Sequence, residues 1–374
     1  MINIVTPMRT LVLHFLVLVS IAEAQVPKFA VHELATDLKG GYQVVVADVN
    51  GDGKPDLIAL ASGIPDLVWF ENPTWKRHVL GVGFNRMINC AFEVVDGKPF
   101  VVLAHEFNNE ASKSTGIVSV LTPDGDPTLP WKAREIDRIP TSHRIRAFKL
   151  DGKTVFLNTP LTAGDARPPD YRGHPPMVYY RPGVWKRELI STEEEGVLHG
   201  VWIEGPDSFL TASFLGIHRY THVKKRWIRT EITPGDPSPW PKSGSSDVAV
   251  AGGLIVAIEP WHGSQVVVYD SNGKQQQIID SSLTDGHTIQ VADLNANHHT
   301  QIIAGYRGAG GGLNLYDRVK GEWQRTVLDP KMPTAACVVA DLNKDGRVDL
   351  ACIGATSFKW YENLGGPDTG TPRQ

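Results

Sequence analysis

The feature that most constrains the fold of this chain is a stretch, residues 285–328, that divides into four short apolar runs. The runs cover residues 287–292, 301–304, 313–316 and 323–328, and polar or glycine-rich segments separate them. Each run has about the length of a β-strand, and turn-forming residues lie at its ends. The stretch therefore predicts a unit of four short, consecutive strands.

Six other parts of the chain follow the same order of runs. The first of them contains VVVADVNGDGKPDLIAL, LVWFEN and WKRHVL, which match the runs of residues 285–328. The seven units cover residues 42–80, 87–136, 143–190, 199–232, 247–279, 285–328 and 334–363. A period of roughly 40 to 50 residues with four strands per unit is typical of a β-propeller. The sequence therefore predicts an all-β, seven-bladed β-propeller that occupies residues 25–364 as one domain.

The last unit is incomplete, and its missing strand is found at the other end of the chain. Residues 334–363 contain three runs and lack the outer strand with the pattern W-x-R-x-x-[IL], which residues 28–34, KFAVHEL, resemble. We expect this N-terminal strand to complete the seventh blade and close the ring, which leaves no open sheet edge. A β-sandwich is the alternative fold, but it does not explain why a tryptophan recurs at the same place in four units, at Trp75, Trp185, Trp227 and Trp323.

The two ends of the chain differ from the repeats. Arg9 precedes an apolar run, residues 11–22, and Ala22-Glu23-Ala24 resembles a signal-peptidase site, so residues 1–24 are predicted to be a signal peptide. We expect a secreted or periplasmic protein with no membrane association after cleavage; an uncleaved anchor is the alternative. Residues 365–374 are expected to be a disordered tail. The formal net charge of −4 does not indicate a nucleic-acid partner, and no pattern predicts the oligomeric state.

Three cysteines, Cys90, Cys337 and Cys352, are too few for a disulfide scaffold. Cys337 and Cys352 lie on runs that pair across one turn, so they can face each other. We expect a buried pair of free thiols, because disulfides between neighbouring strands need awkward geometry. A disulfide is the alternative in an exported protein.

Two turns carry an ion-binding pattern. Oxygen-bearing side chains alternate around a glycine in both turns, in the first unit at Asp48, Asn50, Asp52 and Asp56 and in the last at Asp341, Asn343, Asp345 and Asp349. Ca²⁺ takes six to eight such oxygens. We therefore expect a structural calcium ion in each turn, and the alternative is a turn that these side chains cap without any metal.

The repeats resemble known families. The D-x-N-x-D-G-x-x-D turns within repeated blades are similar to FG-GAP and VCBS repeat proteins. The segments SHRIRAF, LNTPL, GVLHG, IEPWHG, GHTIQVADLN and AGYRG resemble the propeller domain of aldos-2-ulose dehydratase and its bacterial relatives. That resemblance implies elimination of water from a keto-sugar such as 1,5-anhydrofructose.

Histidines recur at one register of the units. His143, His199 and His287 each stand just before the first apolar run of their unit. The first strand of a blade begins, and the second ends, at the same mouth of the channel, which we name the top face. Residues expected at the ends of second strands are His105, Glu106, Glu259, His262, Tyr306 and Arg307. These side chains are therefore predicted to converge at the top face, with Arg86 and Arg144 nearby.

This convergence predicts a metal site, and the resemblance implies that the site would serve a lyase. Neutral imidazoles suit Zn²⁺ or a similar ion, and three nitrogens with an open position are typical of a catalytic site. Our hypothesis makes His143, His199 and His287 metal ligands or base, and His105 or His262 the proton donor. Four residues would orient the sugar: Glu106, Glu259, Tyr306 and Arg307.

Other functions are compatible with the same residues. Each histidine taken singly is also compatible with an ordinary hydrogen-bonded rim residue. A calcium-stabilised propeller could bind a glycan or a partner protein at this face without chemistry. A glycoside hydrolase would need two carboxylates flanking its substrate, for which Glu106 and Glu259 are the candidates.

Overall fold

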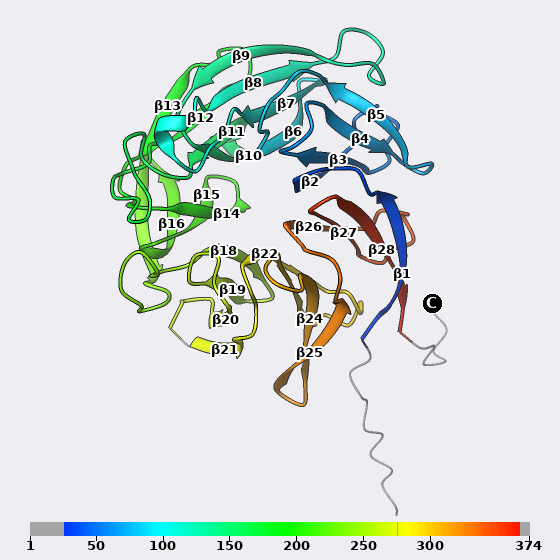
Figure 1. Ribbon diagram of the computed structural model, residues 1–374, viewed down its shortest axis with the longest axis vertical. Coiled ribbons are helices and arrows are strands. Elements are labelled where there is room, and N and C mark those ends of the chain that lie inside the picture. Colours follow the sequence, from blue (N-terminus) through cyan, green and yellow to red (C-terminus); the bar gives the residue numbers. More distant parts are fainter. Residues whose placement is uncertain (1–25, 275, 367–374) are drawn as a thin grey trace, which may run out of the picture.

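Seven antiparallel sheets of four strands each surround a central channel (Figure 1). The computed structural model describes residues 26–274 and 276–366. The predicted signal peptide and residues 367–374 of the predicted tail lie outside these residues. Within the described residues, the single helical element is the 3₁₀ turn η1 (Ala111–Lys113), and no helix has the length and apolarity needed to cross a membrane. The seven-bladed propeller is confirmed.

The blades coincide with the seven predicted units, and the strands of each blade run in order from the channel to the perimeter. The strands of blades one to three are β2 (Gly41–Ala47), β3 (Asp56–Ala61), β4 (Leu67–Glu71), β5 (Lys76–Gly81), β6 (Asn89–Val95), β7 (Lys98–His105), β8 (Ile117–Thr122), β9 (Lys132–Arg138), β10 (Ser142–Leu150), β11 (Lys153–Pro160), β12 (Met177–Tyr180) and β13 (Arg187–Ser191). Those of blades four and five are β14 (Leu198–Gly205), β15 (Ser208–Ser213), β16 (Gly216–Val223), β17 (Arg226–Thr233), β18 (Asp247–Ala251), β19 (Leu254–Glu259), β20 (Gln265–Asp270) and β21 (Gln276–Asp280). Those of blades six and seven are β22 (Gly286–Ala292), β23 (Gln301–Tyr306), β24 (Gly312–Val319), β25 (Glu322–Asp329), β26 (Ala336–Ala340), β27 (Asp349–Gly354), β28 (Ser357–Gly365) and β1 (Lys28–Ala35).

The N-terminal strand closes the ring as predicted. β1 pairs antiparallel with β28 as the outer strand of blade seven, with Val31 opposite Tyr361. Figure 1 shows β1 in dark blue beside β28 in red. First and last parts of the chain thus share one sheet, and the ring has no unpaired gap between its ends.

A layer of polar side chains near the channel joins five of the seven pairs of neighbouring blades. Gln43 Nε2 donates to the carbonyl of Cys90, and Asn89 Oδ1 accepts the amide of Ile145. The same kind of bond continues around the ring in the pairs Arg144 Nε to His199 O, Ile289 N to Asp247 Oδ2 and Cys337 N to Thr288 Oγ1. The five side chains in these bonds are Gln43, Asn89, Arg144, Asp247 and Thr288. They explain why polar residues are buried at the centre of the fold, because buried polar groups need partners.

Tyrosines tie the blades together farther from the axis. Tyr180 donates to Asp137 of the preceding blade, and the same arrangement joins Tyr316 to Asp280. Their phenol groups reach carboxylates on the previous outer strand, while their rings are fully buried between blades. The repeated tyrosines therefore serve both packing and polar contact.

The acidic turns lie on the opposite, bottom face, where the inner strands end. In the first turn, Gly53 N donates to Asp48 Oδ2, and both oxygens of Asp56 accept backbone amides. In the last turn, Gly346 N donates to Asp341, and Asp349 accepts the amides of two other residues in the same way. These contacts are those of capped turns. Asp48 Oδ1, however, is buried and has no hydrogen-bond partner among the described residues, which is also expected of a metal-ligand oxygen. Calcium stays a prediction for both turns.

Candidate functional site

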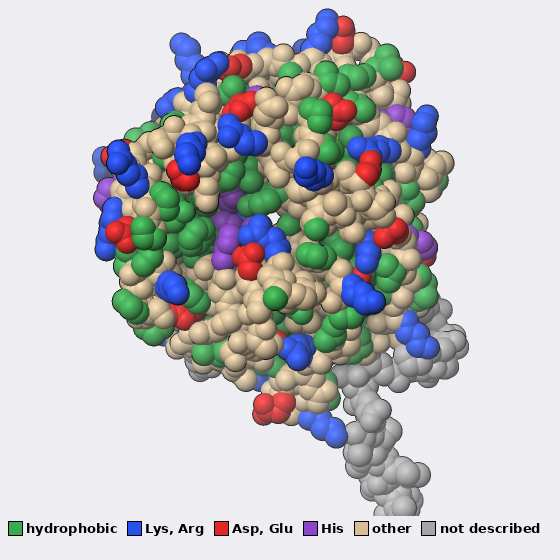
Figure 2. All heavy atoms as spheres, viewed as in Figure 1, with side chains coloured by type: hydrophobic (Ala, Val, Ile, Leu, Met, Phe, Trp, Pro, Cys, Tyr) green, Lys and Arg blue, Asp and Glu red, His purple; other side chains and the backbone are tan. Residues whose placement is uncertain are grey.

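Four inner strands carry an irregularity at their second residue. The pairing register shifts around Tyr42 in β2, His143 in β10, His199 in β14 and His287 in β22. The described inner strands of the other three blades have no such shift. A bulge re-aims the side chain of the extra residue, and here the four side chains are brought together at the top of the channel. Figure 2 shows histidine side chains, in purple, lining the hollow at the centre of the viewed face.

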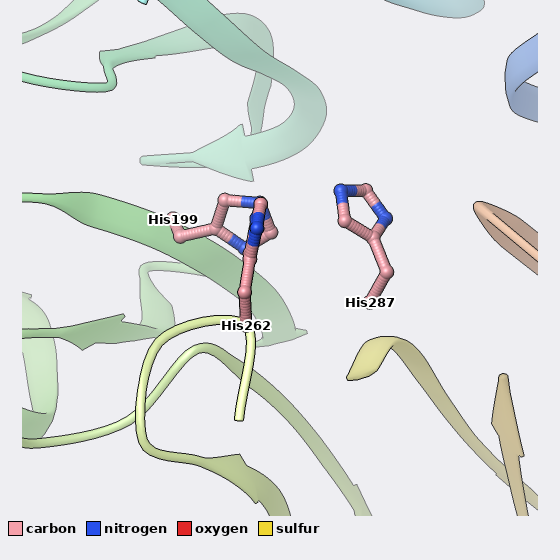
Figure 3. A group of neighbouring side chains, drawn as sticks. All are labelled: His199, His262 and His287. Carbon is pink, nitrogen blue, oxygen red and sulfur yellow. The ribbon is translucent and has the colours of Figure 1, made fainter. Parts of the chain in front are cut away.

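The imidazoles of four histidines form one cluster. His199 is the central member, with ring centroids 5.0 Å from His143, 5.0 Å from His262 and 5.1 Å from His287. His262 joins from the connection between β19 and β20, and Figure 3 shows His199 and His262 together with His287 facing them. One nitrogen from each of His199, His262 and His287 lies within 4.8 Å of the others. The set that can share an ion is therefore these three residues, which differs from the predicted set of His143, His199 and His287.

The Nδ1 atoms of the three histidines are held by acceptors. His199 Nδ1 lies 3.0 Å from the carbonyl oxygen of Ser246, and His287 Nδ1 lies 2.6 Å from that of Ala335. His262 Nδ1 lies 3.0 Å from Oδ1 of Asp285. Carbonyl and carboxylate oxygens only accept, so each Nδ1 carries the proton and each Nε2 keeps its lone pair.

The Nε2 atoms are arranged as metal ligands are. His199 Nε2 and His262 Nε2 lie 3.4 Å apart, and two nitrogens bound to one tetrahedral Zn²⁺ are separated by about 3.3 Å. His287 Nε2 is buried with no partner among the described residues. Metal-binding histidines generally donate their second N–H to a carboxylate or carbonyl group, as all three do here. The residues present therefore fit a divalent ion with three protein ligands.

Burial keeps these imidazoles neutral. It lowers the pKa of His199 and His287 well below the usual value, and the positive charge of Arg144 lowers both further. Burial also lowers the pKa of His262, although its hydrogen bond to Asp285 opposes the shift. Only the neutral form of imidazole binds a metal, so the electrostatics agree with the geometry.

His143 has a different partner. Its Nε2 lies 2.9 Å from the hydroxyl of Tyr42, and its Nδ1 is buried without a partner among the described residues. The Tyr42 ring also meets His287 edge to face, with centroids 5.2 Å apart. His143 and Tyr42 thus form a hydrogen-bonded pair beside the three ligand candidates.

A cavity of about 500 Å³ opens above the cluster. Its lining combines hydrogen-bonding groups with apolar surface, from Tyr42, Ser62, Arg86, Ile88, Phe107, Asn108, Asn109, His143, Leu161, His199, Trp261, His262 and Arg307. Glu106 holds Arg86 in place at 3.0 Å, and Asp285 holds Arg307 at 3.2 Å. A polar molecule of monosaccharide size fits such a volume.

The other predicted residues occupy mixed positions. Arg307 lines the cavity as expected, Glu106 acts through Arg86, and Tyr306 lies beside Gly312 in blade six without lining the cavity. His105 Nε2 lies 3.0 Å from Ser119 Oγ and its ring packs on Phe84, outside the four-histidine cluster.

Glu259 also lies away from the cavity lining. Its Oε1 accepts hydrogen bonds from Ser245 and Tyr269, and the residue is fully buried. Burial raises the pKa of this carboxyl group to about 7. His262, three residues later in the sequence, turns into the histidine cluster. The two side chains therefore point in different directions although they are close in the sequence. Glu106 and Glu259 do not form a flanking pair of cavity carboxylates, as the glycosidase alternative would require.

Two important residues were missed in the sequence. Tyr42 stands at the same register as the three predicted histidines, as the second residue of its inner strand, and this register is the signal that could have identified it. Asp285 precedes His287 by two residues but orients His262 and Arg307 instead. No sequence signal links Asp285 to those partners, because they come from other connections.

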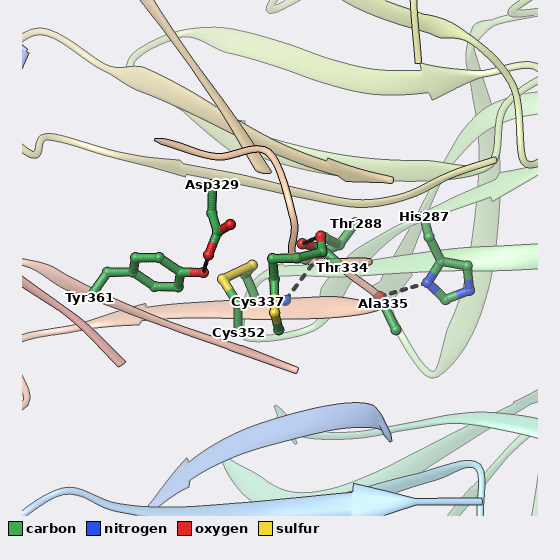
Figure 4. The surroundings of a disulfide bond; sticks show 9 residues. His287, Thr288, Asp329, Thr334, Ala335, Cys337, Cys352 and Tyr361 are labelled. Atoms are coloured by element: carbon green, nitrogen blue, oxygen red, sulfur yellow. Dashed lines mark hydrogen bonds between the residues drawn. A yellow bond between two sulfur atoms is a disulfide. The ribbon is translucent and has the colours of Figure 1, made fainter. Parts of the chain in front are cut away.

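The cysteine expectation was wrong. Cys337 and Cys352 are directly opposed in β26 and β27 and form a disulfide, with Cα atoms 4.1 Å apart, while Cys90 is a buried free thiol. The close, direct opposition of the two residues in the antiparallel ladder allows the bond that the sequence argument set aside. Figure 4 shows this disulfide beside Ala335, which accepts the hydrogen bond of His287.

Fold and site together define a seven-bladed β-propeller with a histidine cluster at one mouth of its channel. Residues 115–272 match the family model of the aldos-2-ulose dehydratase β-propeller domain, and residues 40–63 match the FG-GAP repeat. The chain is thus similar to both families, as its motifs indicated. The first match includes His143, His199 and His262 but not His287.

Comparisons with whole proteins add support for the fold. No curated protein matches the chain. Among solved structures, the WD40 β-propeller domain of Doa1 is similar with a TM-score of 0.56 and 11% identity, over 90% of this chain and 96% of that one. At this identity the likeness shows the propeller architecture alone.

Proposed function

We propose that this protein is a metal-dependent carbon–oxygen lyase that eliminates water, or a glycosidic leaving group, from a keto-sugar in the top-face cavity. The observation that carries the proposal is the arrangement of three imidazoles whose Nδ1 atoms are anchored and whose Nε2 atoms share one centre. The similarity of residues 115–272 to a dehydratase propeller domain agrees with it.

His199, His262 and His287 would hold the ion, for which Zn²⁺ is the best fit. The bound ion would supply Lewis-acid polarisation of a carbonyl or hydroxyl oxygen. His199 and His262 also line the upper cavity, so an ion held by them would be accessible from it. Arg307, fixed by Asp285, and Arg86, fixed by Glu106, would orient sugar hydroxyl groups at the rim.

Tyr42 and His143 would move the proton. Elimination next to a carbonyl group begins with loss of the proton on the adjacent carbon, which requires a base within reach. Tyr42 lines the cavity and shares a hydrogen bond with His143 Nε2, so the proton can pass between phenol and imidazole. His143 is buried and neutral, since burial lowers its pKa well below the usual range and Arg144 lowers it further. Its neutral Nε2 can accept a hydrogen bond from the Tyr42 hydroxyl, which would orient that hydroxyl for proton transfer.

Metal analysis together with an activity assay tests the proposal. We expect purified protein to contain one transition-metal ion, and His199→Ala and His287→Ala to lose both this ion and the appearance of an ultraviolet-absorbing enone from keto-sugars. His299→Ala, at an exposed bottom turn, is the matched control and should behave like wild type. Wild-type protein that takes up no transition metal, or variants that keep their activity, would contradict the lyase.

The same experiment separates the lyase from a binding propeller. A calcium-stabilised protein that recognises glycans at this face would bind sugars without forming the enone, and histidine substitutions would leave its metal content unchanged. We also propose export to the periplasm or outside the cell, on the basis of residues 1–24. Fractionation of cells that express the full chain tests this point.

A further inference from the structure

A second cavity of about 500 Å³ occupies the channel below the histidine cluster. Tyr42 lines both cavities, while His287 lines the lower one. Two arginines of the same strand, Arg144 and Arg146, also line the lower cavity. Residues two apart on a strand share a face, so both side chains lie on the channel side, where Arg144 reaches His199 of blade four and Arg146 reaches Asn89 of blade two.

Neither arginine has a carboxylate partner. Arg144 donates from Nε to the carbonyl of His199, and its Nη2 lies 3.4 Å from His199 Nε2. Arg146 donates from Nη1 to Asn89 Oδ1 and to the carbonyl of Ile145. These are the partners of neutral groups, and no ion pair to either arginine is formed among the described residues. Arg144 is 6% exposed. Buried charges are normally paired, because leaving one unpaired is costly.

The acidic residues that line the cavity balance only part of this charge, because Asp247 attracts both arginines but forms an ion pair with neither among the described residues. Asp247 has one oxygen on the amide of Ile289 and the other on that of Val248, so its carboxylate is held by backbone donors. Glu93 lies toward the bottom mouth, where it also lines a separate cavity beside Asp48. The two arginines thus leave an excess of positive charge beside the His cluster.

We infer that the lower cavity is an anion site, in which Arg144 and Arg146 bind a small oxyanion of phosphate or carboxylate type. Guanidinium groups present paired N–H donors that match two oxygens of one anion. The hydrogen bonds with described residues leave Nη2 and Nε of Arg146 for such a ligand, and Asn89 uses only its oxygen in the bonds above. Burial lowers the pKa of Arg146 to about 10, and Arg144 adds to the shift. A bound anion would oppose both effects.

This site adjoins the proposed lyase centre, because His287 lines the lower cavity and Arg144 contacts His199. Binding of an anion there does not require the proposed lyase activity. Its ligand would be a free mineral anion or the carboxylate of a sugar acid, and both share the same oxygen pair. Inorganic phosphate and glucuronate are the two probes that distinguish them. Binding is measured by titration calorimetry and by the thermal midpoint, each against chloride at matched ionic strength, with no turnover required.

We expect wild-type protein to bind one of the two probes saturably, and Arg146→Met to bind it at least about tenfold more weakly. Arg134→Met removes the same charge from the exposed strand β9 and should bind like wild type. In buffer without the probe, Arg146→Met should melt no lower than wild type, because it removes a half-buried charge that has no ion-pair partner among the described residues.

Equal binding by wild type and Arg146→Met, or no saturable binding of either probe by wild type, would overturn the inference. If Arg146→Met does not fold, Arg146→Lys carries the test. Lysine keeps the charge but not the paired donors, so weaker binding supports the site and unchanged affinity refutes it.

Discussion

Asp285 Oδ1 lies 3.0 Å from His262 Nδ1, although the two residues come from different connections of the top face. The same carboxylate holds Arg307, so one acidic group orients both a ligand candidate and a cavity cation. This arrangement makes Asp285 the most informative residue outside the three histidines.

Asp285→Asn should weaken metal binding by about 10- to 100-fold without removing a ligand, because partners of metal-bound histidines have effects of this size. The amide keeps the shape of the side chain but loses the charge that fixes His262. Competition with a coloured chelator measures the affinity. Asp293→Asn, in the bottom turn of blade six, is the control, and an unchanged affinity in Asp285→Asn would contradict the assigned role.

Tyr42→Phe should lower turnover of a keto-sugar by about 100-fold or more while metal content stays at the wild-type level. The phenol is lost but the ring that packs against His287 remains. Tyr179→Phe also removes one hydroxyl, but from a residue that bonds Glu188 in the outer part of blade three, and it should keep full activity. Loss of the metal in Tyr42→Phe would assign a structural role instead.

Glu259 should make stability depend on pH. Burial raises its pKa to about 7 from a usual value of 4.5, despite the hydrogen bonds from Ser245 and Tyr269. A carboxyl group with a raised pKa stabilises the fold fully below about pH 4.5, and this contribution is lost as the pH rises through about 7.

The loss from Glu259 should be on the order of 3 kcal/mol in the free energy of unfolding. Glu259→Gln stays neutral, so denaturant unfolding of this variant should lack that part of the decrease. If the free energy of unfolding falls equally with rising pH in wild type and variant, Glu259 is not the cause of the decrease.

Replacement of Cys337 and Cys352 by alanine should cost about 3 kcal/mol of stability, since the disulfide closes a loop with a sequence separation of 15. Urea unfolding measures the change. Cys90→Ala removes a buried sulfur without opening a loop and should cost clearly less. An equal loss in both proteins would mean that packing, and not the cross-link, determines the effect.

Calcium should raise the thermal midpoint if the turns at Asp48 and Asp341 bind it. An ion at 100 times its dissociation constant contributes about 2.7 kcal/mol through binding to the folded state. Asp48→Asn combined with Asp341→Asn should abolish the rise. A midpoint that is the same in calcium and in chelator would identify both turns as capped by their own side chains.

The fold was predictable from the sequence because propeller blades are local units. Each four-strand run, such as residues 285–328, has its own apolar spacing and turns, and residues 28–34 match the strand that the last unit lacks. The register of His143, His199 and His287 followed from the same repetition. Composition and spacing therefore determined the architecture and the face of the propeller that carries the candidate site.

Only the tertiary structure decided which side chains meet. Bulges at the second residue of four strands aim Tyr42 and three histidines inward, and a bulge depends on pairing with the neighbouring strand. His262 turns into the cluster while Glu259, three residues earlier, turns into blade five. The disulfide, the anchors of each Nδ1 and the two unpaired arginines likewise arise from contacts between distant residues, which repeat spacing does not encode.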